Sequence, residues 1–313
     1  MSSKTTGGGS PALRSALLLV VPAAVLGTVL AWALAATDPL QSEAPVRALA
    51  DCAGATVVGL AALPRLHRRI DPPWRQLAVV GGIWTVLEFA VLACAAAQVV
   101  GVPVSRLGMN AFGTYLAHVS SGQVGIAILV GTAVVTGYCA LAHRQPDRAA
   151  IDLVLMFAAV ALELRPITGH MSQQPLGAVF AAVHVLAAAA WFGLLLALTL
   201  VLRSRGEWAR VLPRYSAWAL PAVAAVTVSG IIDGLVKLGG LTPLVDTGYG
   251  RILLAKAVLL IGLLVLGWWW RRSWVPAAAD HRLSADSSLR RAIAEVVVIA
   301  VVFGLAATLS VTA

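Results

Sequence analysis

Long apolar stretches separated by short polar connections recur along the whole chain. About 20 apolar residues are needed for a helix to cross a hydrocarbon layer of roughly 30 Å. Nine stretches approach or exceed this length, and the second and fifth are the shortest. They cover residues 14–36, 47–63, 77–100, 119–142, 149–164, 176–202, 216–235, 251–270 and 292–312. The pattern predicts an all-α, polytopic transmembrane helical bundle of about nine spans.

The connections between these stretches are too short to form a separate soluble domain. The first residues, "SSKTTGGGSP", have the composition of a flexible linker. We therefore predict a disordered tail over residues 1–13, four membrane helices over 14–142 and five membrane helices over 149–313. The boundary between the two groups falls at "HRQPDR", residues 143–148.

Positively charged side chains are distributed unevenly between the two ends of the predicted bundle. Lys and Arg near span ends favour the cytoplasmic side, and 17 of the 23 fall at the end that carries the N-terminus. We predict a cytoplasmic N-terminus and an outside C-terminus. The six cations on the outer half are Arg47, Arg106, Arg165, Lys237, Arg251 and Lys256.

Composition supports a membrane protein and limits the functional classes. The chain is 59% hydrophobic and 12% charged, with a mean hydropathy of +0.87, which is too apolar for a soluble domain. The net charge of +9 then reflects topology and attraction to anionic lipid, rather than nucleic-acid binding. The three cysteines all lie within predicted spans, so no disulfide framework is indicated.

The first apolar stretch also has features of a signal peptide. Lys4 and Arg14 precede it, and "ALA" stands at 33–35. We interpret it as a retained helix because it is longer than the usual apolar region of a signal peptide. Cleavage would leave eight spans.

Motifs for energy coupling and several cofactors are absent from the sequence. There is no GxxxxGK[ST] and no DKTG, so the chain is not itself an ATP-driven pump. No CxxCH and no paired CxxC occur either. We expect no enzymatic activity.

The histidines predicted on the outer side are the main candidates for binding chemistry. His170 precedes the sixth span, and His184 lies roughly 12 Å below the outer end of that span. His118 begins the fourth span, and Met171 follows His170. Imidazole and thioether together suit copper, as Cu(I) or Cu(II). His184 could instead be a packing histidine that hydrogen-bonds a carbonyl or serine.

Ionisable residues inside predicted spans are candidates for an ion or proton pathway, because charges within a bilayer are costly. Glu88 lies near the middle of the third span, and we expect it to be protonated or to pair with Lys256. Glu295 stands close to two arginines, which predicts a local ion pair. Trp191, seven residues after His184, is expected to share its helix face and wall the pocket.

Several segments of the C-terminal half together resemble the CopD family of bacterial copper-resistance membrane proteins. They are "TGH" at 168–170, "VHVLAAAAWFG" at 183–193, "LPRYSAWAL" at 212–220, "VTVSGII" at 226–232, "TGYGRILLAKAVLL" at 247–260 and "RRAIAEVVV" at 290–298. The resemblance covers mainly residues 165–313. The sequence departs from the family pattern at "WFGLL", 191–195, where one glycine is missing.

The resemblance implies copper transport or handling at the bacterial cytoplasmic membrane, with a periplasmic CopC-type protein as a possible partner. It carries functional roles to His170, His184, Trp191, Tyr249, Arg251, Lys256 and Glu295. We predict a copper site of His170 and His184, with Met171 and His118 as further candidates. Lys256, Arg251 and Glu88 would set its electrostatic field.

Two other functions remain open from the sequence. The protein could deliver copper to a cuproenzyme such as a terminal oxidase, without net transport. It could also be a membrane redox protein in which His118 and His184 ligate a b-type haem.

Overall fold

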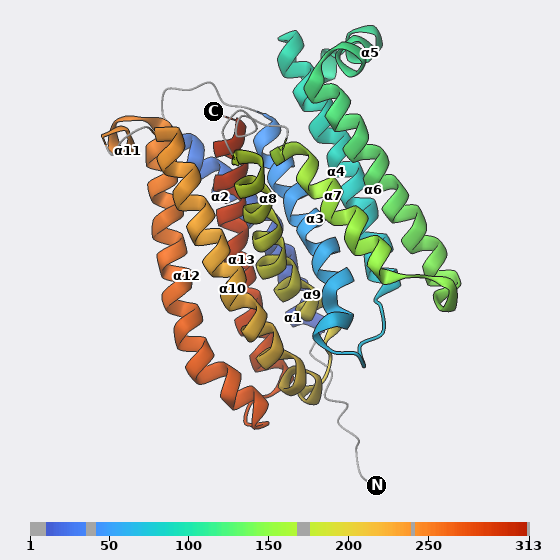
Figure 1. Ribbon diagram of the computed structural model, residues 1–313, viewed down its shortest axis with the longest axis vertical. Helices are drawn as coiled ribbons and strands as arrows, with labels where there is room; N and C mark the ends of the chain where they lie inside the picture. The colour runs from blue at the N-terminus through green and yellow to red at the C-terminus, as the bar shows by residue number, and fades with distance from the viewer. Residues whose placement is uncertain (1–10, 36–41, 168–175, 239–241, 312–313) are drawn as a thin grey trace.

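The computed structural model describes residues 11–35, 42–167, 176–238 and 242–311, and all regular structure in these ranges is helical (Figure 1). Short 3-10 turns occur at Ala16–Leu19, Val104–Arg106 and Pro146–Arg148, and a π-helical turn, Ala189–Gly193, joins α8 to α9. The α-helices are α1 (Pro11–Ser15), α2 (Val20–Ala35), α3 (Glu43–Leu66), α4 (Trp74–Val100), α5 (Met109–His118), α6 (Ser120–Arg144), α7 (Ile151–Ile167), α8 (Gly177–Ala188), α9 (Leu194–Val201), α10 (Arg205–Leu238), α11 (Pro243–Asp246), α12 (Gly248–Ala279) and α13 (Ala285–Val311).

The fold confirms the predicted all-α polytopic bundle. Eight helical segments in the described residues are long and apolar enough to cross a membrane. The fifth predicted span forms α7, whose 17 residues rise about 26 Å, slightly less than a typical hydrocarbon layer. The side of the membrane that each end faces stays a prediction.

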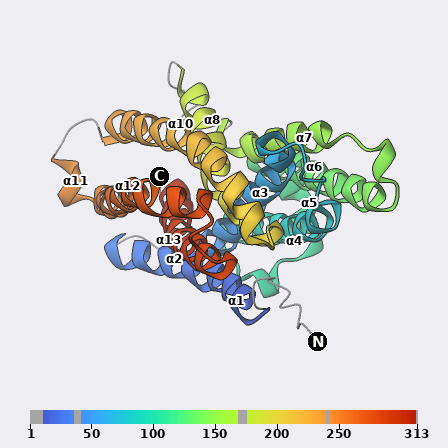
Figure 2. The same ribbon diagram turned by 90° about the horizontal axis from the view of Figure 1, so that it is seen from below.

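Helix α3 lies at the centre of the bundle, where it packs against α2, α4, α7, α9 and α13 (Figure 2). In its spanning stretch 67% of the residues are buried, against 11% for α12. The second predicted span, 47–63, was too short, because the helix extends from Glu43 to Leu66. Charged residues such as Glu43, Arg47 and Asp51 are compatible with this helix because neighbouring helices pack around it.

Two pairs of glycines allow the backbones of neighbouring helices to pack in direct contact. A Cβ placed on Gly193 of the π-helical turn would overlap the carbonyl of Ala55 on α3, and one placed on Gly59 would overlap the backbone of Gly193. Gly27 of α2 and Gly304 of α13 meet in the same way. Small residues let membrane helices gain packing energy where lipid offers no hydrophobic driving force.

The two predicted groups of helices share one core. The boundary at residues 143–148 falls on the end of α6 and the turn Pro146–Arg148. However, α2 packs along α13, and α3 packs against α7, α9 and the π-helical turn. The division into two groups therefore describes the order of the helices rather than separate bodies.

Candidate functional site

His184 lies in the second turn of α8, against α10. Its Nδ1 is 2.9 Å from Oγ of Ser229, and Ser229 in turn donates its hydroxyl hydrogen to the carbonyl of Ala225 over 2.6 Å. Because a serine has one hydrogen to donate, the tautomer that fits both contacts carries its proton on Nδ1 of His184. In that tautomer Nε2 has a lone pair, the state that binds a metal ion.

The imidazole sits on a surface made by small residues of α10. A Cβ placed on Gly230 would lie 3.3 Å from Cε1 of His184, so the ring packs directly over this glycine. Ser229 is the contact that a packing histidine would also make. The contact with Ser229 uses Nδ1, a backbone hydrogen bond to Val226 also acts on the ring, and His184 is half-buried.

Asp233 lies one turn beyond Ser229 on α10, toward the end of the bundle where α8 begins. Its Oδ1 is buried and has no hydrogen-bond partner in the described part of the chain. Lys256 and Lys237 are within electrostatic range of this carboxylate, and the Lys237 ammonium lies 4.8 Å from the ring centroid of Tyr249. A buried carboxyl oxygen without a partner is a candidate cation ligand, because such a group is costly unless it is paired.

Arg251 and Lys256 both lie on α12 but have different surroundings. Arg251 donates from Nε to the carbonyl of Leu34 over 2.7 Å and from Nη2 to that of Ala35 over 3.4 Å. It therefore satisfies the free carbonyls at the end of α2 and complements the helix dipole. Lys256 acts electrostatically on His184 as well as on Asp233. Of the two, Lys256 is the residue that influences the His184 region.

Trp191 and Glu295 form a buried pair in the core. Trp191 stands in the π-helical turn and donates from Nε1 to Oε1 of Glu295 on α13 over 3.2 Å. The hydroxyl of Tyr215 donates to the carbonyl of Trp191 over 3.3 Å, a backbone group within the irregular turn. The predicted ion pair between Glu295 and its neighbouring arginines was wrong, because its described partner is the indole. The π-helical turn adds a residue after His184, so Trp191 points toward α13.

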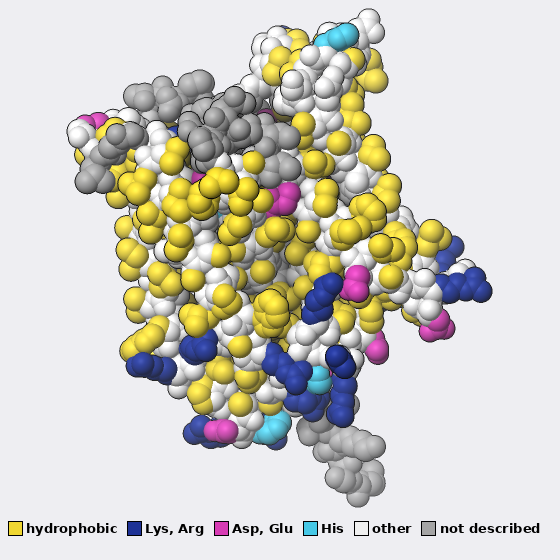
Figure 3. Space-filling model, in the orientation of Figure 1, with side chains coloured by type: hydrophobic (Ala, Val, Ile, Leu, Met, Phe, Trp, Pro, Cys, Tyr) yellow, Lys and Arg dark blue, Asp and Glu magenta, His cyan; other side chains and the backbone are white. Residues whose placement is uncertain are grey.

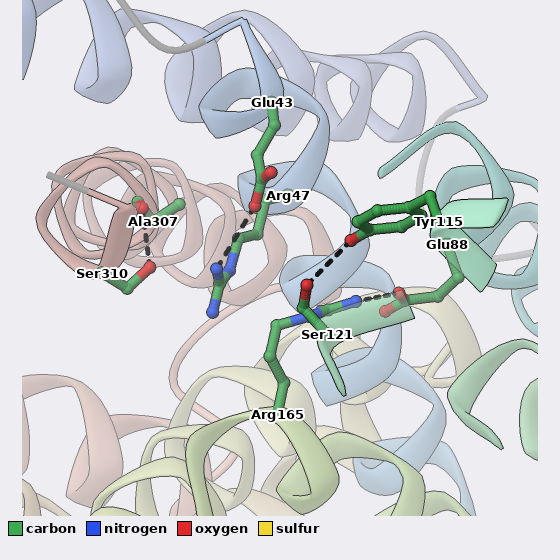
Figure 4. A network of polar contacts seen from close by, with 8 residues as sticks. All are labelled: Glu43, Arg47, Glu88, Tyr115, Ser121, Arg165, Ala307 and Ser310. Carbon is green, nitrogen blue, oxygen red and sulfur yellow. Dashed lines mark hydrogen bonds and ion pairs between the residues drawn. The ribbon is translucent and has the colours of Figure 1, made fainter. Parts of the chain in front are cut away.

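Glu88 is the centre of a second buried polar cluster, between α3, α4 and α7. It accepts from Nη2 of Arg165 over 2.7 Å and from Nε1 of Trp84 over 3.1 Å, and its side chain is 3% exposed. The predicted pairing of Glu88 with Lys256 is therefore wrong. Arg165 lies at the end of α7, which packs against α3, and it reaches the carboxylate that Lys256 on α12 was expected to meet (Figure 4).

Helix α3 adds further charges beside this pair. Arg47 is 3.4 Å from Oε1 of Glu43 one turn earlier, and Asp51 lies within electrostatic range of both Arg47 and Arg165. The cluster thus contains carboxylates and guanidinium groups from three helices. Its mixed charge is compatible with the interior of the bundle, where ionisable residues pair with one another.

The remaining candidate ligands lie elsewhere or cannot be described. His118 is exposed at the end of α5, which packs on α4 and α6, whereas α8 packs on α7 and α10 (Figure 1). His118 and His184 therefore do not lie on facing helices, as the haem alternative requires. His170 and Met171 fall outside the described residues. Within those ranges no group of three metal-binding side chains is found.

Sequence reasoning missed several residues of these clusters. Ser229 and Trp84 gave no signal, because serine and tryptophan are ordinary inside membrane helices. Glu163 of α7 did give one, since it is an acid in an otherwise apolar stretch. Both of its oxygens are buried without a hydrogen-bond partner in the described residues.

The fold and its buried ionisable residues define a multi-pass membrane protein. The resemblance found in the sequence is confirmed, because residues 209–309 match the family described as Copper resistance protein D, CopD. This segment covers most of α10, all of α11 and α12, and most of α13, and it does not include α8.

Two curated proteins are similar to parts of the chain. Copper transport protein CutJ of Bacillus subtilis (strain 168) is 32% identical over 124 residues, which are 36% of this chain and 23% of that protein. Inner membrane protein YebZ of Escherichia coli (strain K12) is 34% identical over 90 residues, which are 27% of this chain and 31% of that protein. The chain thus matches less than a third of the length of either relative. No solved structure gives a significant match.

Proposed function

We propose that this protein binds copper on the side of the bundle where α8 begins and moves it across the membrane. The observation that carries the proposal is the hydrogen bond between His184 and Ser229, which leaves Nε2 as a ligand atom beside α10. Most of α10 lies in the segment that matches CopD. The similarity to a protein named for copper transport supports copper as the cargo. A CopC-type protein outside the membrane would be a source of the ion.

The proposed ligands combine soft and charged donors. His170 and Met171 stand seven and six residues before Gly177, the first residue of α8, and the proposal retains them as further ligands. Imidazole and thioether donors suit Cu(I). Asp233 would offset the positive charge of the ion, and its buried Oδ1 supports this role.

A second carboxylate lies on the inward side of His184. Trp191 is seven residues further along the chain, roughly 10 Å deeper, and it holds Glu295 through its indole. The π-helical turn at this level interrupts regular helix packing, and such turns are frequent at functional sites. We assign Glu295 as the next group that binds the cation on its way inward. Trp191 positions the carboxylate of Glu295 through its indole.

The test is copper uptake by sealed vesicles that contain the purified protein and an internal copper-sensitive dye. We expect uptake by the unmodified protein and a loss of at least about tenfold in His184→Ala, in line with the effect of removing a metal-site residue. His143→Ala is the matched control, because His143 is exposed at the far end of α6.

The delivery alternative gives a different result in the same experiment. A protein that only hands copper to a cuproenzyme would bind the ion but would not accumulate it in vesicles. Unchanged uptake in His184→Ala would instead contradict the proposed site.

A further inference from the structure

A hollow of about 520 Å³ opens at the arginine-rich end of the bundle, away from the copper site. It lies where the end of α3 and the following residues meet α10. Its polar and aromatic lining residues are Arg65, His67, Arg68, Arg69, Arg214 and Trp218.

The positive charges of this pocket are poorly compensated. Arg65 pairs with Asp152 over 2.8 Å, but both side chains are at least half exposed, so this ion pair is weak. Arg214 donates to the carbonyl of Leu66 over 2.9 Å and forms no ion pair with a carboxylate among the described residues. Arg68 and Arg69 are exposed, and neither forms an ion pair within the described ranges.

A buried imidazole nitrogen completes the polar lining. Nε2 of His67 is buried and has no hydrogen-bond partner in the part of the chain described. Guanidinium groups and an imidazole together match an oxyanion with several acceptor oxygens, and phosphate is such a group.

The position of Trp218 indicates that the pocket opens at the depth of lipid headgroups. Trp218 lies one turn after Arg214 on α10 and is 60% exposed. On α12, Trp268 and Trp269 are also exposed, and the guanidinium of Arg272 lies 4.0 Å from the Trp268 ring. Tryptophan is enriched at the membrane interface. Figure 3 shows Lys and Arg gathered toward the same end, below an apolar surface.

We propose that this pocket binds the phosphate of an anionic phospholipid, with the acyl chains lying along α10 beside Trp218. Free phosphate shares the headgroup chemistry but has no apolar part to cover Trp218 and Leu220, which is 59% exposed. The lipid is therefore the ligand that satisfies both the arginines and the exposed apolar surface.

The test counts the lipids bound to the full-length protein by native mass spectrometry, in detergent with phosphatidylglycerol or with phosphatidylcholine of the same acyl chains. We expect phosphatidylglycerol to bind at least fivefold more strongly, and Arg68→Gln/Arg69→Gln to lose this preference. These arginines are exposed, so the variant should fold. The control Arg144→Gln/Arg148→Gln removes the same charge from exposed positions on and after α6 and should keep the preference.

A further measurement distinguishes binding of the phospholipid from binding of free phosphate. Inorganic phosphate at millimolar concentration should not displace the bound lipid or stabilise the protein against heat as phosphatidylglycerol does. Equal binding of the two lipids, an unchanged preference in Arg68→Gln/Arg69→Gln, or full competition by phosphate would overturn the proposal.

Discussion

Nε1 of Trp191 lies 3.2 Å from Oε1 of Glu295, although the two residues are 104 positions apart in the chain. This bond joins the π-helical turn to α13 in the middle of the bundle. Trp191 is 6% exposed and Glu295 is 8% exposed, so neither can satisfy its polar group with bulk water.

Removing the indole donor should destabilise the protein more than neutralising the carboxylate. Trp191→Phe leaves an oxygen of Glu295 buried without its donor, at a cost of about 1–3 kcal/mol. Glu295→Gln keeps an oxygen that accepts from the indole and should cost less than about 1 kcal/mol. Thermal unfolding of the purified variants measures both, and a larger loss in Glu295→Gln would refute this explanation of the pair.

Glu295→Gln also separates binding from movement of the ion. Under the proposed function it should bind copper with nearly unchanged affinity, because the outer ligands are intact. Uptake into vesicles should fall several-fold, because the inward carboxylate has lost its charge. Normal uptake would remove Glu295 from the pathway.

Gly193 lies so close to α3 that adding a single methyl group at this position should destabilise the protein. Gly193→Ala forces the two backbones apart and should destabilise the protein by about 3 kcal/mol or more. Gly137→Ala on α6 is the control, since a Cβ there meets nothing within 4 Å, and it should be neutral or stabilising by up to about 1 kcal/mol. The yield of folded protein and its unfolding temperature distinguish the two variants.

The pair of Glu88 and Arg165 should be more sensitive to loss of one partner than of both. Arg165→Leu leaves the buried carboxylate of Glu88 without its main counter-charge, at a cost of roughly 3 kcal/mol or more. Glu88→Gln/Arg165→Leu removes both charges and should recover part of that loss. If the double variant is no more stable than Arg165→Leu in thermal unfolding, charge pairing is not the main role of this contact.

The pocket at the arginine-rich end should make stability depend on pH through His67. Partial burial of the ring and the positive charges of Arg214, Arg210 and Arg69 lower the pKa of His67 from its ordinary value. The folded state then resists protonation of His67. The contribution of His67 to stability is therefore complete above its unfolded-state pKa of about 6.5, and it is lost as pH falls toward the lowered folded-state pKa.

The unmodified protein should therefore lose more stability than His67→Gln between about pH 7.5 and pH 5. Phosphatidylglycerol should reduce this difference, because a bound phosphate favours the imidazolium form. Parallel pH profiles for the two proteins would show that His67 does not titrate in this pocket.

The helical architecture was predictable because apolar stretches of membrane length leave few alternatives. The prediction was least accurate where protein, rather than lipid, surrounds a helix. The prediction for α3 left out its two ends, which carry Glu43 and Arg65, although that helix is the most buried of the spans. The orientation of the bundle, which rests on the distribution of Lys and Arg, stays a prediction.

The candidate site was predictable only in part. His184 stood out as an imidazole inside an apolar helix, but its hydrogen bond to Ser229 joins residues 45 positions apart. No local pattern indicates such a contact. The partners of Glu88 and Glu295 were predicted wrongly for the same reason, since spacing along a helix identifies near neighbours and not the helix packed opposite. The roles of His170 and Met171 stay predictions.

The central claim is that His184 supplies a copper ligand, and the most direct test is the binding of Cu(I) by the purified protein in competition with a chromogenic chelator. The unmodified protein and His143→Ala should each bind one Cu(I) per chain with the same affinity. His184→Ala should bind at least about tenfold more weakly, and Ser229→Ala should be intermediate because it loses only the group that orients the ring. Equal Cu(I) affinity in His184→Ala and the unmodified protein would contradict the account.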